Sequence, residues 1–332
     1  MSMVREEISS SYPKSMFGSQ SIATEKRPLR ESIRNFVNRL AYGTAWAMKP
    51  ERARVLPYVW WELFKHDLMP HALRRLPDRA LALDFGEGLA GVYDRLTPDA
   101  ALAAYAKGLY PFAHVGPMKW WTPPKRSVLF FQETHLEKNL RRLLRQKKYQ
   151  VSFDKDFSSV VRACAAPRPG RYHLTWIRPD IIECFTRLHR MGHAHSVEVR
   201  DQDGDLVGGI YGLSVGKVFF TESQFFKSRD ASKVGFAVLN QHLQHWGFAL
   251  NDGKNETPHL RQTGFVNVSR QEFEQVVDKY AKTPFMVGPW SIDKTLDVST
   301  WVPAEAGGLA RRTVLATRKK SLPRSRSKTA AM

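Results

Sequence analysis

The amino-acid sequence predicts an α+β fold whose central sheet lies in the second half of the chain. Residues 195–225 contain three strand-like runs joined by Asp-Gly and Val-Gly turns, the pattern of a meander. Residues 230–247, "DASKVGFAVLNQHLQHWG", have helical periodicity. The strand "FALND" and the helix "SRQEFEQVVDKYAK" follow. The order of meander, helix, strand and helix, with a crossover helix after a central strand, is typical of α+β domains.

The first half of the chain predicts mainly helices. Residues 1–30 lack periodicity and are predicted to be disordered, whereas residues 31–75 are predicted to form a helical extension that includes "VLPYVWWELFKHDLMPHALRRL". Thr97 is expected to cap a helix over 97–112 that Gly108 ends. The stretch "YQVSFDKDFSSVVRACA" predicts a strand and then a helix, and "PDIIECFTRLHRMG" predicts a further helix. Asp230 or Ser232 is expected to cap the helix after the meander.

Charge and composition narrow the class of protein. The chain has 332 residues, 42% of them hydrophobic, and a net charge of +19, which favours a nucleic acid or another acidic partner. Eight Lys and Arg residues and no acid follow Glu305, so residues 305–332 are predicted to be a disordered basic tail; without them the net charge is +11 (19 − 8).

The chain is predicted to be cytoplasmic and without membrane contact, and we expect a monomer. The two cysteines, Cys164 and Cys184, form no CxxC pair, and no apolar run is long enough to span a membrane. His189, His193 and His195 precede Glu198, but a glycine interrupts the helix between the first two, so no metal site is predicted.

Three groups of residues are candidates for a site. "KWWTPPKR" (119–126) places Trp120 and Trp121 beside cations, which suits either nucleobase stacking or a core-and-loop segment. Glu222 lies on an apolar strand, where a carboxylate indicates a site or a structural ion pair. In "LNDGKN" (250–255), Asp252 and Lys254 would share one face of a strand, although Asn-Asp-Gly also suits a hairpin turn.

These residues lie in a collinear run of motifs that resembles the leucyl/phenylalanyl-tRNA–protein transferases. The run extends from about residue 96 to about residue 273. It includes "LTPDAALAAYAKGLYPF", "WWTPPKRSVL", "FDKDFSSVVRACA", "TWI", "LHRMGHAHSVEV", "LVGGIYGLSVGKVFFTESQF" and "ASK", followed by the spacing from Asp252 to His259.

The resemblance implies a GNAT-type acyltransferase domain over 136–300 with a smaller N-terminal domain over 76–135. It implies transfer of Leu or Phe from aminoacyl-tRNA to the N-terminal Arg or Lys of an acceptor protein, which marks the acceptor for degradation, without metal or coenzyme. Trp176 and Glu222 match site residues of the family, and Asp252 falls on its catalytic aspartate.

The chain departs from the family pattern beside that aspartate. The family has Asp-Cys-Gln where this chain has Asp252, Gly253 and Lys254. A protonated lysine offers donors only, so Lys254 is expected to stabilise an oxyanion, pair with Asp252 or hold a phosphate rather than accept a proton. Asp252, Lys254 and Glu222 are the predicted catalytic residues.

The predicted substrate-binding set also contains changed residues. Asn251 replaces an apolar residue of the family, Gln224 a methionine, and Phe112 a tryptophan. These changes leave two alternatives open: a paralogue with a more polar donor or another acceptor, and a catalytically silent tRNA- or protein-binding module. The full predicted set is Trp176, Phe112, Trp120, Trp121, Arg126, Ile210, Phe219, Ser223, Gln224, Leu239 and Asn251.

Overall fold

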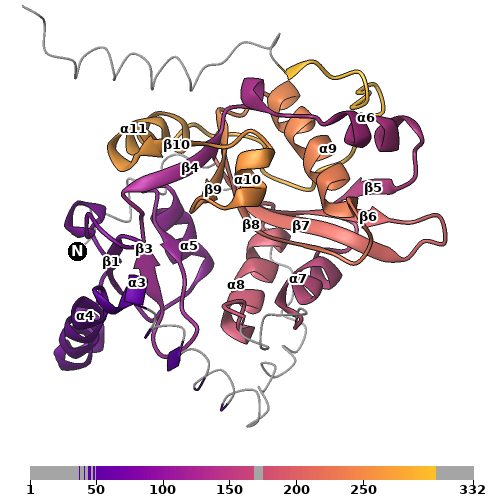
Figure 1. Cartoon of the computed structure of the whole chain (residues 1–332). Helices are drawn as coiled ribbons and strands as arrows, with labels where there is room; N and C mark the ends of the chain where they lie inside the picture. The colour runs from indigo at the N-terminus through magenta and orange to yellow at the C-terminus, as the bar shows by residue number, and fades with distance from the viewer. Residues whose placement is uncertain are drawn as a thin grey trace, which may run out of the picture. The chain divides into compact units, whose positions relative to one another are not determined.

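The computed structural model of the chain (Figure 1) describes residues 50–167 and 175–303, together with 37, 41, 44, 45 and 48. The predictions for residues 1–30 and 305–332, and for most of 31–49, concern residues outside this part. The described residues contain one three-stranded and one seven-stranded sheet. The mixture of helices and sheets confirms the predicted α+β class.

The seven-stranded sheet has the order β10-β4-β9-β8-β7-β6-β5. Every neighbouring pair is antiparallel except β8 and β9, which are parallel because helix α9 crosses over between them. The predicted meander is therefore confirmed as β6, β7 and β8. The bounds are β4 Lys125–Leu129, β5 Gln150–Phe153, β6 Ala194–Arg200, β7 Leu206–Val215, β8 Val218–Phe226, β9 Leu250–Lys254 and β10 Val266–Ser269.

The smaller sheet has the order β1-β3-β2, with bounds β1 Leu89–Val92, β2 Tyr110–Pro111 and β3 Lys119–Trp121. It lies within the range predicted for a small N-terminal domain. Strand β4 also falls inside that predicted range, 76–135, yet it pairs with β9 and β10 and so belongs to the large sheet. The small sheet therefore ends at Trp121 and the large sheet takes in the chain from Lys125, while the domain boundary at residue 135 stays a prediction.

Helices cover both faces of the large sheet. Helices α7 and α8 lie on one face, and α9 with α6 lies on the other (Figure 1). The helix bounds are α3 Pro50–Ala53, α4 Leu56–Leu68, α5 Pro98–Tyr105, α6 Lys138–Arg145, α7 Phe157–Ala165, α8 Pro179–Arg190, α9 Ala231–Trp246, α10 Pro258–Gln262 and α11 Arg270–Tyr280, with 3-10 turns η2 His71–Leu73, η3 Arg79–Leu81 and η4 Phe131–Glu133.

Two apolar clusters fill the space between the helices and the sheet. On the α7–α8 face, Phe185 and Tyr211 pack with Phe220 of β8. On the α9 face, Ile210 and Phe219 pack with Leu239. Neighbouring residues on one strand, such as Phe219 and Phe220, therefore face different clusters, as the alternation of side chains along a strand requires.

The helix ends test the predicted caps. The Thr97 hydroxyl accepts a hydrogen bond from the Ala100 N–H at the start of α5, as predicted. Asp230 is the N-cap residue of α9, but it has a left-handed backbone and makes no side-chain cap bond, so the prediction of a capping side chain there is wrong. A capping box at Ser269 and Glu272 begins α11.

The predicted helix over 55–76 is present as α4, which ends at Leu68 before Pro70. Trp60, Trp61, Phe64 and Leu68 of this helix are exposed. None of the helices in the described part of the chain has both the length and the apolar character that crossing a membrane requires.

Candidate active site

The candidate site lies where β8 and β9 stop pairing. Their parallel register ends at Phe220 and Asp252, although β8 continues to Phe226. Glu222 lies two residues beyond the last paired position of β8, and Lys254 lies two residues beyond that of β9. The two strands therefore carry their charged side chains at the point where the sheet opens.

Asp252 is held by a bidentate ion pair with Arg126 of β4. Arg126 donates from Nε to Oδ1 and from Nη2 to Oδ2 of Asp252, both at 2.7 Å, and both side chains are fully buried. The guanidinium lies over the Tyr110 and Phe273 rings, 5.0 and 4.4 Å from their centroids. Oδ1 of Asp252 also accepts the Lys254 N–H at 3.1 Å, so both oxygens are occupied.

A second ion pair joins Lys254 to Glu222. The Lys254 ammonium donates to Glu222 Oε1 at 2.8 Å and to the Thr221 carbonyl at 2.6 Å. The Tyr105 hydroxyl of α5 donates to the same Oε1 at 2.7 Å. Glu222 Oε2 is buried, and none of the described residues donates a hydrogen bond to it. It is the one carboxylate oxygen of Asp252 and Glu222 that is left to accept a proton or an N–H.

The local sequence explains how Lys254 reaches Glu222. Lys254 has a left-handed backbone, with φ of 65°, which costs a non-glycine residue roughly 1–2 kcal/mol. The bond from its N–H to Asp252 stabilises that conformation. A Cβ at position 253 would lie 2.7 Å from the Phe265 ring and 2.8 Å from Leu260, so glycine fits there without repacking. "LNDGKN" is thus the end of a central strand and not a hairpin turn.

The tyrosines around the cluster are held in their neutral form. Burial, and then the Glu222 carboxylate, raise the pKa of Tyr105 and of Tyr211 well above the usual value. Burial opposes the charge of Arg126, but Asp252 outweighs that effect and raises its pKa. Tyr105 therefore acts as a hydrogen-bond donor to Glu222, and Arg126 remains a cation.

Phe112 and Trp176 form an aromatic pair beside this cluster. Their ring centroids lie 5.8 Å apart, and both side chains are half-buried. Phe112 lies two residues after Tyr110, whose hydroxyl accepts a hydrogen bond from Asn255 at 3.0 Å. Burial, followed by the charge of Arg178, lowers the pKa of nearby Lys119 to about 8. The structure thus brings these two predicted substrate-binding residues together.

The predicted tRNA contacts in "KWWTPPKR" are placed in the interior. Trp120 is fully buried and donates its indole N–H to the Tyr93 carbonyl, while Trp121 donates to the Phe112 carbonyl. Arg126 is held in its ion pair with Asp252. This placement favours the core interpretation of the segment over contact with tRNA, because buried rings offer no face to a nucleobase.

Four of the predicted donor-pocket residues, Asn251, Ile210, Phe219 and Leu239, lie on the opposite face of the sheet. Asn251 is fully buried; its Oδ1 accepts from the Thr221 hydroxyl at 2.8 Å, and its Nδ2 donates to Asn240 Oδ1 at 2.9 Å. Asn240 in turn donates to the Phe236 carbonyl. The Asn251 amide is therefore satisfied within the protein. Ile210, Phe219 and Leu239 are buried on this face, and Ser223 and Gln224 are half-buried on β8.

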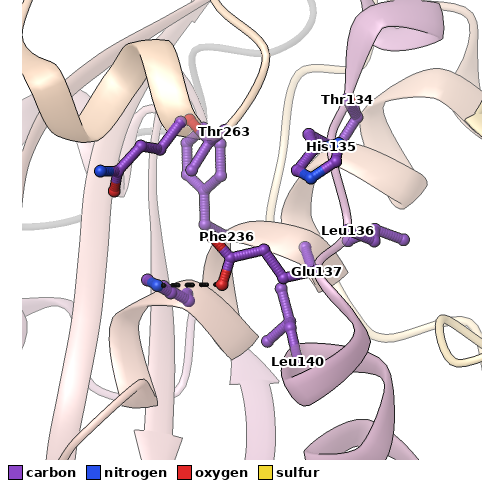
Figure 2. Close-up of a pocket in the computed structure, with 10 residues that line it drawn as sticks. Thr134, His135, Leu136, Glu137, Leu140, Phe236 and Thr263 are labelled. Atoms are coloured by element: carbon purple, nitrogen blue, oxygen red, sulfur yellow. Dashed lines mark ion pairs between the residues drawn. The ribbon is translucent and has the colours of Figure 1, made fainter.

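A separate pocket lies beside α9 (Figure 2). It is lined by Thr134, His135, Leu136, Glu137, Leu140, Lys233, Phe236, Ala237, Gln262 and Thr263. Lys233 and Glu137 face each other across it at 3.6 Å. None of its lining residues belongs to the charged cluster.

The histidines before Glu198 have structural partners. His195 contacts Asp154 at 2.8 Å and stacks on Trp290, and His189 bonds to the Ala194 carbonyl. Within residues 50–167 and 175–303, no group of three or more His, Cys, Asp or Glu is arranged to hold a metal ion. Both cysteines are free thiols.

Sequence reasoning missed Tyr105 and the pairing of Arg126 with Asp252. Tyr105 lies on a helix whose other buried residues are mostly alanine, so its hydroxyl gives no pattern of its own. Arg126 and Asp252 are 126 residues apart, and only the pairing of β4 with β9 brings them together.

Comparisons with known proteins match this region. A family model described as "Leucyl/phenylalanyl-tRNA protein transferase" matches residues 128–278, and the model of its N-terminal domain matches residues 94–124. The transferase from Cellvibrio japonicus is 44% identical over 218 residues, which cover 65% of this chain and 92% of that protein. The transferase from Maridesulfovibrio salexigens is 39% identical, over 70% and 93%.

A solved structure of L-PGS from Bacillus licheniformis is 8% identical and overlaps 43% of this chain and 45% of its own, with a TM-score of 0.28, too low to support a common fold. The sequence relatives are decisive, because they match most of their own length at high identity. The chain therefore belongs to the leucyl/phenylalanyl-tRNA–protein transferase family.

Proposed function

We propose that this protein transfers an amino acid, Leu or Phe, from aminoacyl-tRNA to the N-terminal Arg or Lys of acceptor proteins, and so marks them for degradation. Family membership supports the reaction class. The Asn251 amide supports an apolar donor, because its oxygen and its nitrogen both already have partners within the protein.

The observation that carries the chemistry is the unpaired Oε2 of Glu222. The acceptor nitrogen attacks the ester carbonyl; a C–N bond forms, and the C–O bond to the tRNA ribose breaks. The nitrogen loses a proton and the ribose oxygen gains one, so the reaction needs no oxidant or cofactor. Glu222 is the group that holds the amine and relays its proton, with Asp252 fixing Arg126 and Lys254 around it.

The opening between β8 and β9 supports a GNAT-type arrangement. The pairing of β8 with β9 ends at Phe220 of β8 and Asp252 of β9, and Glu222 and Lys254 lie two residues further along. An acyl donor that enters at this opening would place its ester beside Glu222. Holding the two reactants in such a geometry supplies about 7–11 kcal/mol of the barrier reduction in favourable cases.

The tRNA donor is supported by the charge of the surface. Helix α6 and the turn after it expose five cations: Lys138, Arg142, Arg145, Lys147 and Lys148. Such a group suits phosphate contacts. The aromatic pair of Phe112 and Trp176 suits stacking on a base. Because the donor is aminoacyl-tRNA, we place the reaction in the cytoplasm. We also propose that the protein acts as a monomer.

The test is transfer of radiolabelled amino acids from charged tRNA to a peptide beginning with Arg. Labelled Leu and Phe are expected to enter the peptide, and an N-acetylated peptide is the matched control that should receive none. Incorporation of a polar amino acid in their place would indicate a paralogue with another donor. Binding of tRNA without any transfer would indicate a silent binding module.

A further inference from the structure

The charge balance of the buried cluster limits the form in which an amine can bind. Arg126 and Lys254 supply two positive charges, and Asp252 and Glu222 supply two negative ones, in two ion pairs of 2.7 and 2.8 Å. Each carboxylate already has a full cationic partner. A protonated substrate amine would therefore bring an uncompensated third cation into the interior.

Tyr105 of α5, Tyr211 of β7 and Lys254 of β9 interact with Glu222 itself. Tyr110 of β2, Arg126 of β4 and Asp252 of β9 complete the titratable groups of the cluster. The charged neighbour Glu87, which acts on Tyr110, is itself paired with Arg52 at 3.0 Å. Burial raises the pKa of all three tyrosines, so they stay neutral throughout the range in which an α-amine titrates. Among the residues that the structure describes, the charges within the cluster are therefore those of the two ion pairs.

The free oxygen of the cluster suits a neutral donor. Glu222 Oε2 is buried and unpartnered, whereas Oε1 is shared by the Lys254 ammonium and the Tyr105 hydroxyl. An uncharged amine can donate one N–H to Oε2 and keep its lone pair for attack. An ammonium has no lone pair, and the Lys254 ammonium across the same carboxylate would repel it.

We propose that Lys254 is a positioning residue that makes the site bind the acceptor α-amine as the free base, with an N–H of that amine donated to Glu222 Oε2. This inference rests on the proposed function. On binding, the acceptor ammonium releases one proton to solvent. During transfer, the amine loses a second proton through Glu222, which passes to the departing ribose oxygen.

Proton release on binding tests the inference without catalysis. The enthalpy of binding of an Arg-initiated peptide is measured at pH 6.5 in buffers of different ionisation enthalpy, with no donor present. An α-amine with a pKa of about 7.7 is then mostly protonated, so the native protein is expected to release about 0.9 proton per peptide. Lys254→Gln leaves Glu222 uncompensated and is expected to release less than about half a proton.

Two further variants make the result specific. Lys254→Arg keeps the cation and is expected to restore proton release, which a role in packing alone would not predict. Lys282→Gln removes an exposed lysine and is expected to behave as the native protein.

The pH profile of the transfer reaction is a second measurement. In Lys254→Gln, the acid limb of the plot of kcat against pH should move to higher pH by about 1–2 units.

The outcomes separate this inference from the proposed function. Equal proton release by the native protein and Lys254→Gln, with transfer intact in the native protein, would overturn the role of Lys254 alone. Failure of the folded native protein to bind the peptide at all would overturn the proposed function and this inference with it. Thermal unfolding of each variant verifies that it is folded.

Discussion

Strand β9 carries a polar group on each face, and the two differ in how completely they are paired. On one face, Asp252 and Lys254 enter two ion pairs that leave Glu222 Oε2 and Arg126 Nη1 without partners. On the other face, the Asn251 amide uses both its oxygen and its nitrogen within a chain of side chains. Both sets are buried, so burial alone does not distinguish them.

The two faces of β9 differ in whether their buried polar atoms have partners. A buried polar group without a partner costs free energy, about 1–3 kcal/mol, which a ligand recovers when it binds. A fully paired network has nothing to offer a ligand and instead fixes the positions of the elements that it joins. The charged face therefore has the properties of a site, and the amide face those of a structural link between β9 and α9.

The largest expected effect is on the charged face. Glu222→Gln removes the proposed proton acceptor and is expected to lower kcat/KM for transfer by about 100- to 10,000-fold. Glu198→Gln is the matched control, because Glu198 is also buried but accepts hydrogen bonds from Ser152 and Ser196 away from the site. If folded Glu222→Gln transfers at the native rate, Glu222 Oε2 does not accept the proton of the acceptor amine.

Arg126→Met tests whether the second ion pair is a support. It leaves the Asp252 carboxylate buried and unpaired, which is expected to lower the free energy of unfolding by about 3–5 kcal/mol in urea titrations. The double variant Arg126→Met with Asp252→Leu removes both charges and should recover most of that loss. Additive losses in the double variant would show that the two side chains do not stabilise each other.

Asn251→Leu tests the other face. It leaves the Asn240 amide without its partner and is expected to cost about 1–3 kcal/mol of unfolding free energy. The preference for Leu and Phe over polar donors should stay the same, because the amide is not available to a substrate. A changed donor preference in charged-tRNA competition assays would place Asn251 in the donor pocket, as the sequence resemblance suggested.

The smallest effect concerns His195, which lies on the same face as Asn251. Burial lowers its pKa despite the opposing effect of Asp154. Below pH 6.5 the unfolded chain therefore binds the proton more readily, and stability is lost as the pH falls through the folded-state pKa, by up to about 1.4 kcal/mol per pH unit. The stability advantage over His195→Gln should shrink between pH 7.5 and pH 5.

The exposed His135 supplies the control for this pH dependence. His135→Gln should follow the native protein at each pH in the same denaturant titrations. If the gap between the native protein and His195→Gln stays constant with pH, the histidine is not buried as a neutral ring.

Much of the fold followed from local patterns. The strands of the meander, helix α9 and strand β9 were predicted from periodicity and turn residues, and Glu222, Asp252 and Lys254 were predicted to belong to one site. The structure places these three within one hydrogen-bonded cluster. Strand alternation also separates Asn251 from Asp252, which the resemblance alone did not reveal.

Long-range pairing accounts for what local patterns could not predict. Aromatic and basic residues at 119–126 suit either a nucleic-acid surface or a buried core-and-loop segment. The pairing of β3 with β1 and β2 places the tryptophans in the interior, and the pairing of β4 with β9 does the same for Arg126. Tyr105 reaches Glu222 across 117 residues of sequence. The membership of β4 in the large sheet likewise depends on β9 and β10, which lie more than 100 residues later in the sequence.

Gly253 has a consequence for how this site can change. The family has a cysteine at this position and a glutamine at the next, whereas here the Phe265 ring and Leu260 occupy the space of a side chain at 253. Lys254→Gln can therefore be made alone, but Gly253→Cys requires both apolar neighbours to repack. A single substitution therefore reaches the family's residue at 254, whereas its residue at 253 also depends on where the Phe265 and Leu260 side chains lie.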